Sequence, residues 1–76
     1  MNKARRTQIT KLINELEYIR SLIEDVHDEE EDAFEALPES FEGTERYDAM
    51  EEAVDALSDA LDSIGDVIES LECAKE

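Results

Sequence analysis

The chain has 76 residues, enough for one small domain with a thin hydrophobic core. Its 23 acidic and 7 basic side chains give a net charge of -16, so we expect it to repel nucleic acid and anionic membranes and to attract basic protein surfaces. One cysteine, no secretory leader and no apolar run long enough to span a bilayer predict a soluble, cytoplasmic protein without internal disulfides.

The first expected element is a helix at about residues 3–36. Its apolar residues alternate at steps of three and four, with Glu30 as the only break, which is the pattern of a coiled-coil contact line. Ile13, Leu22 and Phe34 flank this line and make the apolar stripe wide. The line consists of Ile9, Leu12, Leu16, Ile19, Ile23, Val26, Ala33 and Leu37.

A turn is expected at residues 37–44. Pro38 cannot continue the first helix because it lacks an amide hydrogen, and Gly43 tolerates the backbone conformations of a turn. Thr44 is a favourable N-cap, so a second helix is expected to begin at residue 45.

The second helix, at about residues 45–74, repeats the coiled-coil pattern and carries a parallel row of mostly small residues. Because the turn is short, the two helices are expected to be antiparallel neighbours. The sequence thus predicts one all-α domain over residues 1–76, an antiparallel two-helix hairpin of coiled-coil type. The second contact line consists of Met50, Val54, Leu57, Leu61, Ile64, Ile68 and Leu71, and the small row of Ala53, Ala60, Val67 and Ala74.

The outer side of the second helix is expected to carry an uninterrupted row of carboxylates. Their spacing places one charge about every 5 Å of helix axis, comparable to the phosphates of one nucleic-acid strand. An acidic cluster at the end of the first helix extends this charge. We predict that these side chains bind a protein partner with a basic surface, of the kind that binds nucleic acid. The row is Asp48, Glu52, Asp55, Asp59, Asp62, Asp66 and Glu69, and the cluster contributes Asp28, Glu31, Asp32 and Glu35.

The same acids permit plainer interpretations. A helix needs a polar face, and the carboxylates can serve solubility alone. A divalent cation at Asp28–Asp32 is a weaker alternative, because no EF-hand spacing is present. Glu24-x-x-His27 has the spacing of a di-iron ligand pair but lies beside the contact line, and Cys73 is expected to be an inert surface thiol. With no nucleophile–base pair and no glycine-rich phosphate loop, we predict no enzyme activity, cofactor or metal.

The stretch Asp28–Ser40, DEEEDAFEALPES, followed by a helix rich in alanine and acids, resembles small uncharacterised proteins of Gram-positive bacteria and their phages. The resemblance spans about residues 5–74, and its most specific part is the Leu37–Ser40 turn. It implies a helical hairpin and a prophage setting, hence the host cell cytoplasm, and it transfers no activity. By analogy, small acidic phage proteins include anti-CRISPR and anti-restriction inhibitors, several of which imitate DNA.

Two functional hypotheses follow and stay open at this point. In the first, the chain is a non-enzymatic, acidic protein-binding module, a phage-type inhibitor that mimics nucleic acid and blocks a DNA- or RNA-binding defence protein of the host. In the second, it is a structural or assembly protein that homo-oligomerises through its apolar helix face. Two helices leave apolar flanks uncovered, so we also expect hairpins to dimerise into a four-helix bundle.

Overall fold

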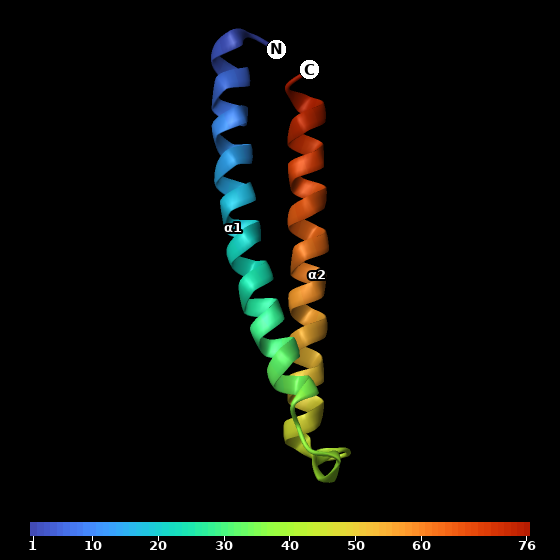
Figure 1. The fold of residues 1–76 in the computed structure, drawn as a ribbon. Helices are drawn as coiled ribbons and strands as arrows, with labels where there is room; N and C mark the ends of the chain where they lie inside the picture. Colours follow the sequence, from blue (N-terminus) through green and yellow to red (C-terminus); the bar gives the residue numbers. More distant parts are fainter.

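The computed structural model describes all 76 residues and shows two long helices that fold back on each other (Figure 1). Helix α1 runs over Lys3–Glu35 and helix α2 over Glu45–Ala74, and the short 3-10 helix η1, Glu39–Phe41, lies in the connection. There are no strands, and the two ends of the chain lie at the same end of the molecule. The predicted antiparallel two-helix hairpin is therefore confirmed.

Local sequence accounts for the limits of α1. At its start, the side-chain oxygen of Asn2 accepts a hydrogen bond of 2.9 Å from the amide of Arg5, which satisfies one of the free amides of the first turn. At its end, the Ala36 amide still donates to the Asp32 carbonyl. Pro38 has no amide hydrogen to donate in the next turn, so α1 stops at Glu35, one residue before the expected limit.

The connection is ordered by its own hydrogen bonds. The Thr44 hydroxyl donates to the Phe41 carbonyl at 2.6 Å and accepts from the Tyr47 amide at 3.2 Å, which makes Thr44 the N-cap of α2. Gly43 has a φ of 80°, the only positive value in the chain, in a region that a side chain makes costly. Gly43 and Thr44 together set the point where α2 begins.

The hairpin is a rod rather than a globule. Its principal extents are 59 × 15 × 13 Å, and its radius of gyration is 17.4 Å. A compact domain of this length has a radius of gyration of about 11 Å. As a result only Ile13 and Ile68 are buried, at 5% and 6% exposure, and every other side chain keeps some contact with solvent.

Helix α2 contacts α1 along the predicted line. Every residue of that line, from Met50 to Leu71, is buried or half-buried in the structure. The line continues at both ends through Tyr47 and Lys75, which are also half-buried.

The predicted contact line of α1 is wrong at every second position. Leu12, Ile19 and Val26 face solvent, at 48%, 45% and 51% exposure, and Ala33 is exposed as well. Compared with the prediction, α1 is rotated about its own axis. At each of these positions, the residue that follows faces α2 instead. The replacements are Ile13, Arg20, His27 and Phe34.

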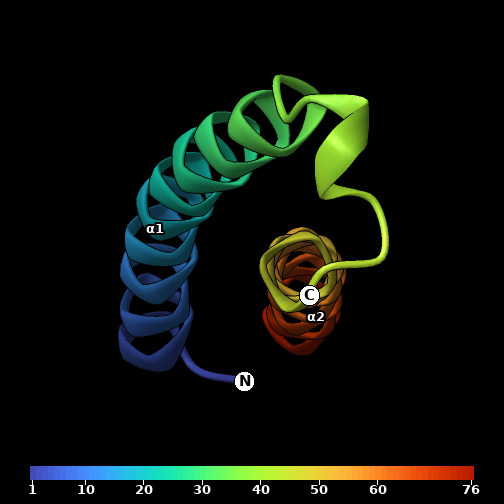
Figure 2. The same cartoon turned by 90° about the horizontal axis from the view of Figure 1, so that it is seen from below.

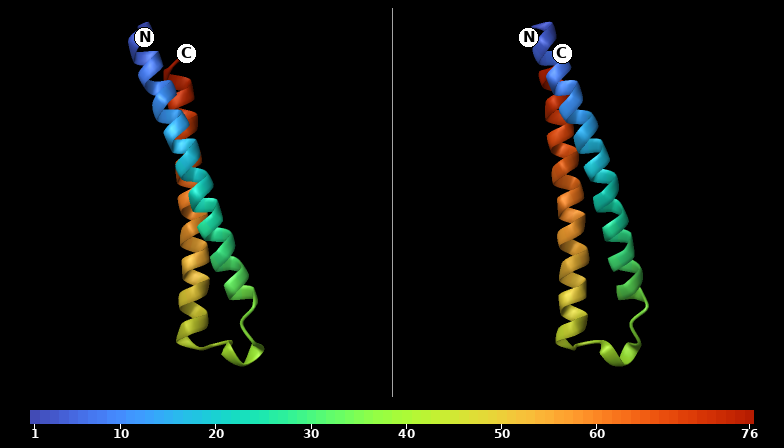
Figure 3. Two further views of the ribbon diagram at one scale, coloured as in Figure 1. Left: turned by 60° about the vertical axis from the view of Figure 1, so that its left-hand side comes forward. Right: turned by 90° about the vertical axis from the view of Figure 1, so that its left-hand side faces the viewer.

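The two helices cross at a shallow angle rather than running side by side along their whole length (Figure 3). Seen along the rod, α1 curves around α2 (Figure 2). Neither helix contains a stretch apolar enough to cross a membrane.

Opposite effects are expected from two glycine substitutions. Gly43→Ala should lower the free energy of unfolding by about 1 kcal/mol, because alanine is strained at a positive φ. Gly65→Ala should raise it by about 0.5–1 kcal/mol, because Gly65 is inside α2 and an added methyl group would meet no atom within 4 Å. Urea unfolding followed by circular dichroism measures both, and equal signs would contradict this description of the turn.

Candidate partner-binding surface

One polar side-chain contact joins the two helices. The Nε2 atom of His27 lies 3.0 Å from the Ser58 hydroxyl oxygen, and Nδ1 lies 3.1 Å from the Asp28 carboxylate. Because a carboxylate only accepts, Nδ1 donates to Asp28, and Nε2 shares a hydrogen bond with the Ser58 hydroxyl, which can donate or accept. The His27 side chain is only 14% exposed, so this bond satisfies a group that lies largely between the helices.

Aromatic side chains close the connecting end of the hairpin. The rings of Phe34 and Tyr47 are tilted at 51° with centroids 4.9 Å apart, a favourable arrangement for two aromatic rings. The guanidinium of Arg46 lies 5.8 Å from the centre of the Phe41 ring. The Phe41 ring therefore makes its contact within the connection.

These contacts define the two sides of the hairpin. Successive residues of a helix are about 100° apart, so Ser58 and Ala60 lie on opposite flanks of the α2 contact line. The bond from His27 to Ser58 puts His27 on the Ser58 side and leaves Val26 on the Ala60 side. One side of the hairpin therefore combines the apolar flanks of both helices, and we call it the apolar face. It consists of Leu12, Ile19, Val26 and Ala33 from α1, and Ala53, Ala60, Val67 and Ala74 from α2.

All seven carboxylates of the acidic row, from Asp48 to Glu69, are exposed on α2. The row extends over about 32 Å of the helix, at 1.5 Å per residue. Two ion pairs join carboxylates to arginine or lysine, Arg20–Glu17 and Lys75–Glu72, and neither involves the row. The carboxylates of Asp28 and Glu31 lie near the His27 ring, and they are not part of the row either. The row is thus a continuous line of negative charge that the chain's own cations leave unpaired.

The acidic cluster at the end of α1 divides into two pairs. Asp28, Asp32 and Glu35 are all exposed, but Asp28 also accepts from His27, and an oxygen of the half-buried Glu31 lies 3.7 Å from the same ring. Asp28 and Glu31 therefore surround His27 rather than continuing the row. No group of three or more histidine, cysteine, aspartate or glutamate side chains is placed to hold a metal ion.

Two other candidates from the sequence, the Glu24–His27 pair and Cys73, do not form a site. Glu24 is exposed while His27 turns toward α2, so the two do not converge on one point. Cys73 is an exposed free thiol. The basic start of α1 lies beside the acidic end of α2, but no ion pair joins the two helices.

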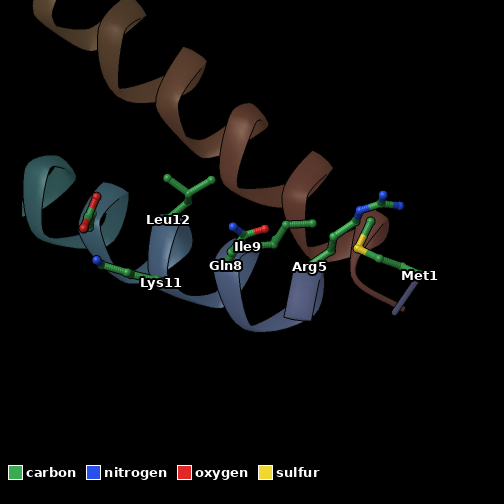
Figure 4. Close-up of a pocket in the computed structure, with 7 residues that line it drawn as sticks. Met1, Arg5, Gln8, Ile9, Lys11 and Leu12 are labelled. Atoms are coloured by element: carbon green, nitrogen blue, oxygen red, sulfur yellow. The ribbon is translucent and has the colours of Figure 1, made fainter. Parts of the chain in front are cut away.

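The largest hollow in the surface, of about 620 Å³, is an open depression on the first four turns of α1. Figure 4 shows Met1 and Arg5 at one end of it and Leu12 and Lys11 at the other. All of its lining residues belong to the first 15 residues of the chain, so it is a groove along one helix and not a cleft between two.

Sequence reasoning expected uncovered apolar flanks but missed the α1 half of the apolar face, because it assigned Leu12, Ile19 and Val26 to the interior. The sequence also contained a signal for the observed contact line, because Ile13 and Phe34, which follow Leu12 and Ala33, are apolar.

Comparison with known proteins found no matching family model, no similar curated protein and no similar solved structure.

Replacing Ser58 by alanine tests the contact between the helices. The Ser58→Ala variant should lose about 0.5–1.5 kcal/mol of unfolding free energy, because the largely buried His27 ring loses its partner. Ser63→Ala is the matched control, since Ser63 is exposed on the same helix and makes no hydrogen bond through its side chain. Thermal or urea unfolding gives the difference between the variants, and equal stabilities would argue against a contribution from the His27–Ser58 bond.

Proposed function

We propose that this chain is a non-catalytic protein-binding module whose acidic row occupies a basic, nucleic-acid-binding groove of another protein. The observation that carries the proposal is the row itself: seven exposed carboxylates along about 32 Å of one helix, without a single ion pair. A protein that binds DNA or RNA presents cations at the spacing of phosphates. A rigid helix with one negative charge about every 5 Å is a suitable competitor for such a groove.

The electrostatics of the whole chain favour the same partner class. A net charge of -16 on a thin rod produces a strong negative potential, which accelerates encounter with a basic surface. The same charge opposes direct binding to nucleic acid, because no cationic patch of comparable strength is present. The partner is therefore expected to be a protein, and binding is expected to weaken as salt screens the charges.

The row also has an energetic cost that solubility alone does not require. Its neighbours are three or four residues apart, and each such pair of like charges destabilises a helix by about 0.2–0.5 kcal/mol. Mixed acidic and basic residues on this face would give solubility and favourable pairs at once. An uninterrupted row is easier to explain when the negative charge has a partner.

The biological role that we propose is that of a phage-type inhibitor, which blocks a DNA- or RNA-binding defence protein of the host. This step rests on the resemblance of the Asp28–Ser40 stretch and on analogy with other small acidic phage proteins.

A pull-down with the tagged chain from bacterial lysate tests the proposal. We expect recovery of a nucleic-acid-binding protein at low salt, its loss at moderate salt, and its displacement by duplex DNA. The double variant Asp55→Lys/Asp59→Lys should recover at least tenfold less of that protein, because it inverts the charge in the middle of the row.

The matched control is Glu24→Lys/Asp25→Lys, which makes the same change in net charge at two exposed positions on the other helix. It should retain binding. Equal recovery by the two variants, or a partner indifferent to duplex DNA, would show that the row does not imitate nucleic acid.

A further inference from the structure

The apolar face presents aliphatic side chains that the hairpin itself leaves uncovered. Leu12, Ile19 and Val26 are about half exposed on α1, and so is Val67 on α2, at 48%. In their place α1 turns Arg20 and His27 toward α2. Placing two part-buried polar side chains, instead of Ile19 and Val26, against α2 forfeits apolar burial inside the hairpin. The rotation of α1 is better explained when the aliphatic side chains have a second contact to make.

The surface area of the chain exceeds that of a compact monomer of the same mass. The hairpin exposes 5615 Å². A folded monomer of this mass exposes about 4,700 Å², so the excess is roughly 900 Å². A stable complex buries about 800 Å² on each partner. The excess is thus of the size that one protein–protein interface removes.

Three residues of the apolar face on each helix are spaced symmetrically along the rod. On α1, Leu12 and Val26 are seven residues before and after Ile19, and on α2, Ala53 and Val67 are seven residues before and after Ala60. Counting from the Phe34–Tyr47 contact, Ile19 and Ala60 lie within about one turn of the same level.

We propose that a second copy of this chain covers the apolar face, turned end for end. The two copies are related by a two-fold axis that is perpendicular to the rod and lies in the interface at the level of Ile19 and Ala60. Each α1 then packs against α1 of the other copy, with Ile19 facing Ile19 and Leu12 facing Val26. The α2 helices approach closely, because their side of the face is made of small residues. The next row round α2 is also small and uncharged, consisting of Ala49, Ala56, Ser63 and Ser70. The product is an antiparallel four-helix bundle.

Charge selects this arrangement over the other two-fold dimer. An axis along the rod would bring the two connecting ends together, and with them two copies of the acidic cluster Asp28–Asp32. The end-for-end axis instead brings Arg5 and Lys11 of one copy to the level of residues 33 and 27 of the other, near the exposed Glu29, which follows Val26 by three residues on the same side of α1. Arg5 and Lys11 border the depression of Figure 4, which is where the acidic end of the second α1 would lie. Opposite charges of the two α1 helices are thus matched at both ends of the bundle.

The dimer is independent of the proposed partner binding. The acidic row lies about a third of a turn round α2 from the row of Ala60, so dimerisation leaves it exposed. Asp55→Lys/Asp59→Lys should therefore abolish partner capture without changing the oligomeric state, and the substitutions below should change the oligomeric state while leaving the row intact.

Sedimentation equilibrium of the intact chain tests the second copy. We expect a species of twice 8.7 kDa at micromolar concentrations, and a melting temperature that rises with protein concentration. Ile19→Asp should lower the association constant at least hundredfold and keep the helicity, because Ile19 is half exposed within one hairpin. Tyr18→Asp is the matched control, since Tyr18 is 66% exposed on the outer side of α1, and it should remain dimeric. A monomeric wild-type chain, or equal effects of the two substitutions, would overturn the proposal.

Disulfide formation tests the direction of the second copy in a Cys73→Ser background. When the Leu12→Cys and Val26→Cys chains are mixed and oxidised, the end-for-end dimer should give the mixed disulfide in at least fivefold excess over Leu12→Cys joined to itself, because two Leu12 positions are about 21 Å apart along the rod. A second mixture, of Leu12→Cys and Val67→Cys chains, tests the dimer with its axis along the rod, which should join these two positions. A mixed disulfide in this second mixture would overturn the orientation that we propose.

Discussion

The narrow contact between two helices is the constraint on which the rest of this structure depends. A pair of helices can bury only the line where they meet, and here just Ile13 and Ile68 are buried. Such a core contributes little, so the other stabilising contacts gain weight: the caps at Asn2 and Thr44, the Phe34–Tyr47 ring pair, and the His27–Ser58 bond. Many apolar side chains stay at the surface, and their location decides what the chain can bind.

The rotation of each helix about its axis places different kinds of side chain on different sides of the rod. One direction carries the contact line, a second the apolar face, and a third the acidic row from Asp48 to Glu69. Because each type of side chain keeps to its own direction for most of the length, the two exposed surfaces do not interfere with each other. An apolar surface recognises a complementary shape at short range, whereas a row of carboxylates acts over about 8–10 Å of solution at physiological salt. The molecule therefore offers two unlike modes of recognition on one thin scaffold.

Sequence periodicity predicted both helices, their antiparallel pairing, the turn at Pro38 and Gly43, and the contact line of α2. It did not predict the rotation of α1. The apolar stripe of α1 is two residues wide, with Leu12 beside Ile13, so periodicity alone cannot choose between neighbouring lines. The choice depends on contacts between distant residues, Phe34 with Tyr47 and His27 with Ser58, which no local pattern contains. The exposure of the acidic row followed from the sequence, while its partner stays a prediction, because a solvated face and a binding face need the same residues.

The bond between His27 and Ser58 has a consequence for the alignment of the helices along their axes. Apolar lines with a seven-residue repeat fit one another almost equally well after a slide of seven residues, as in other coiled coils. A slide of α2 by that distance would bring Gly65 or Glu51 to the place of Ser58. The imidazole would then lose the hydroxyl that satisfies it between the helices, while the aliphatic contacts would be largely restored. This polar pair near the middle of the rod thus acts with the Phe34–Tyr47 ring pair and the short connection to fix the axial register, which the surrounding leucines, isoleucines and valines leave undecided.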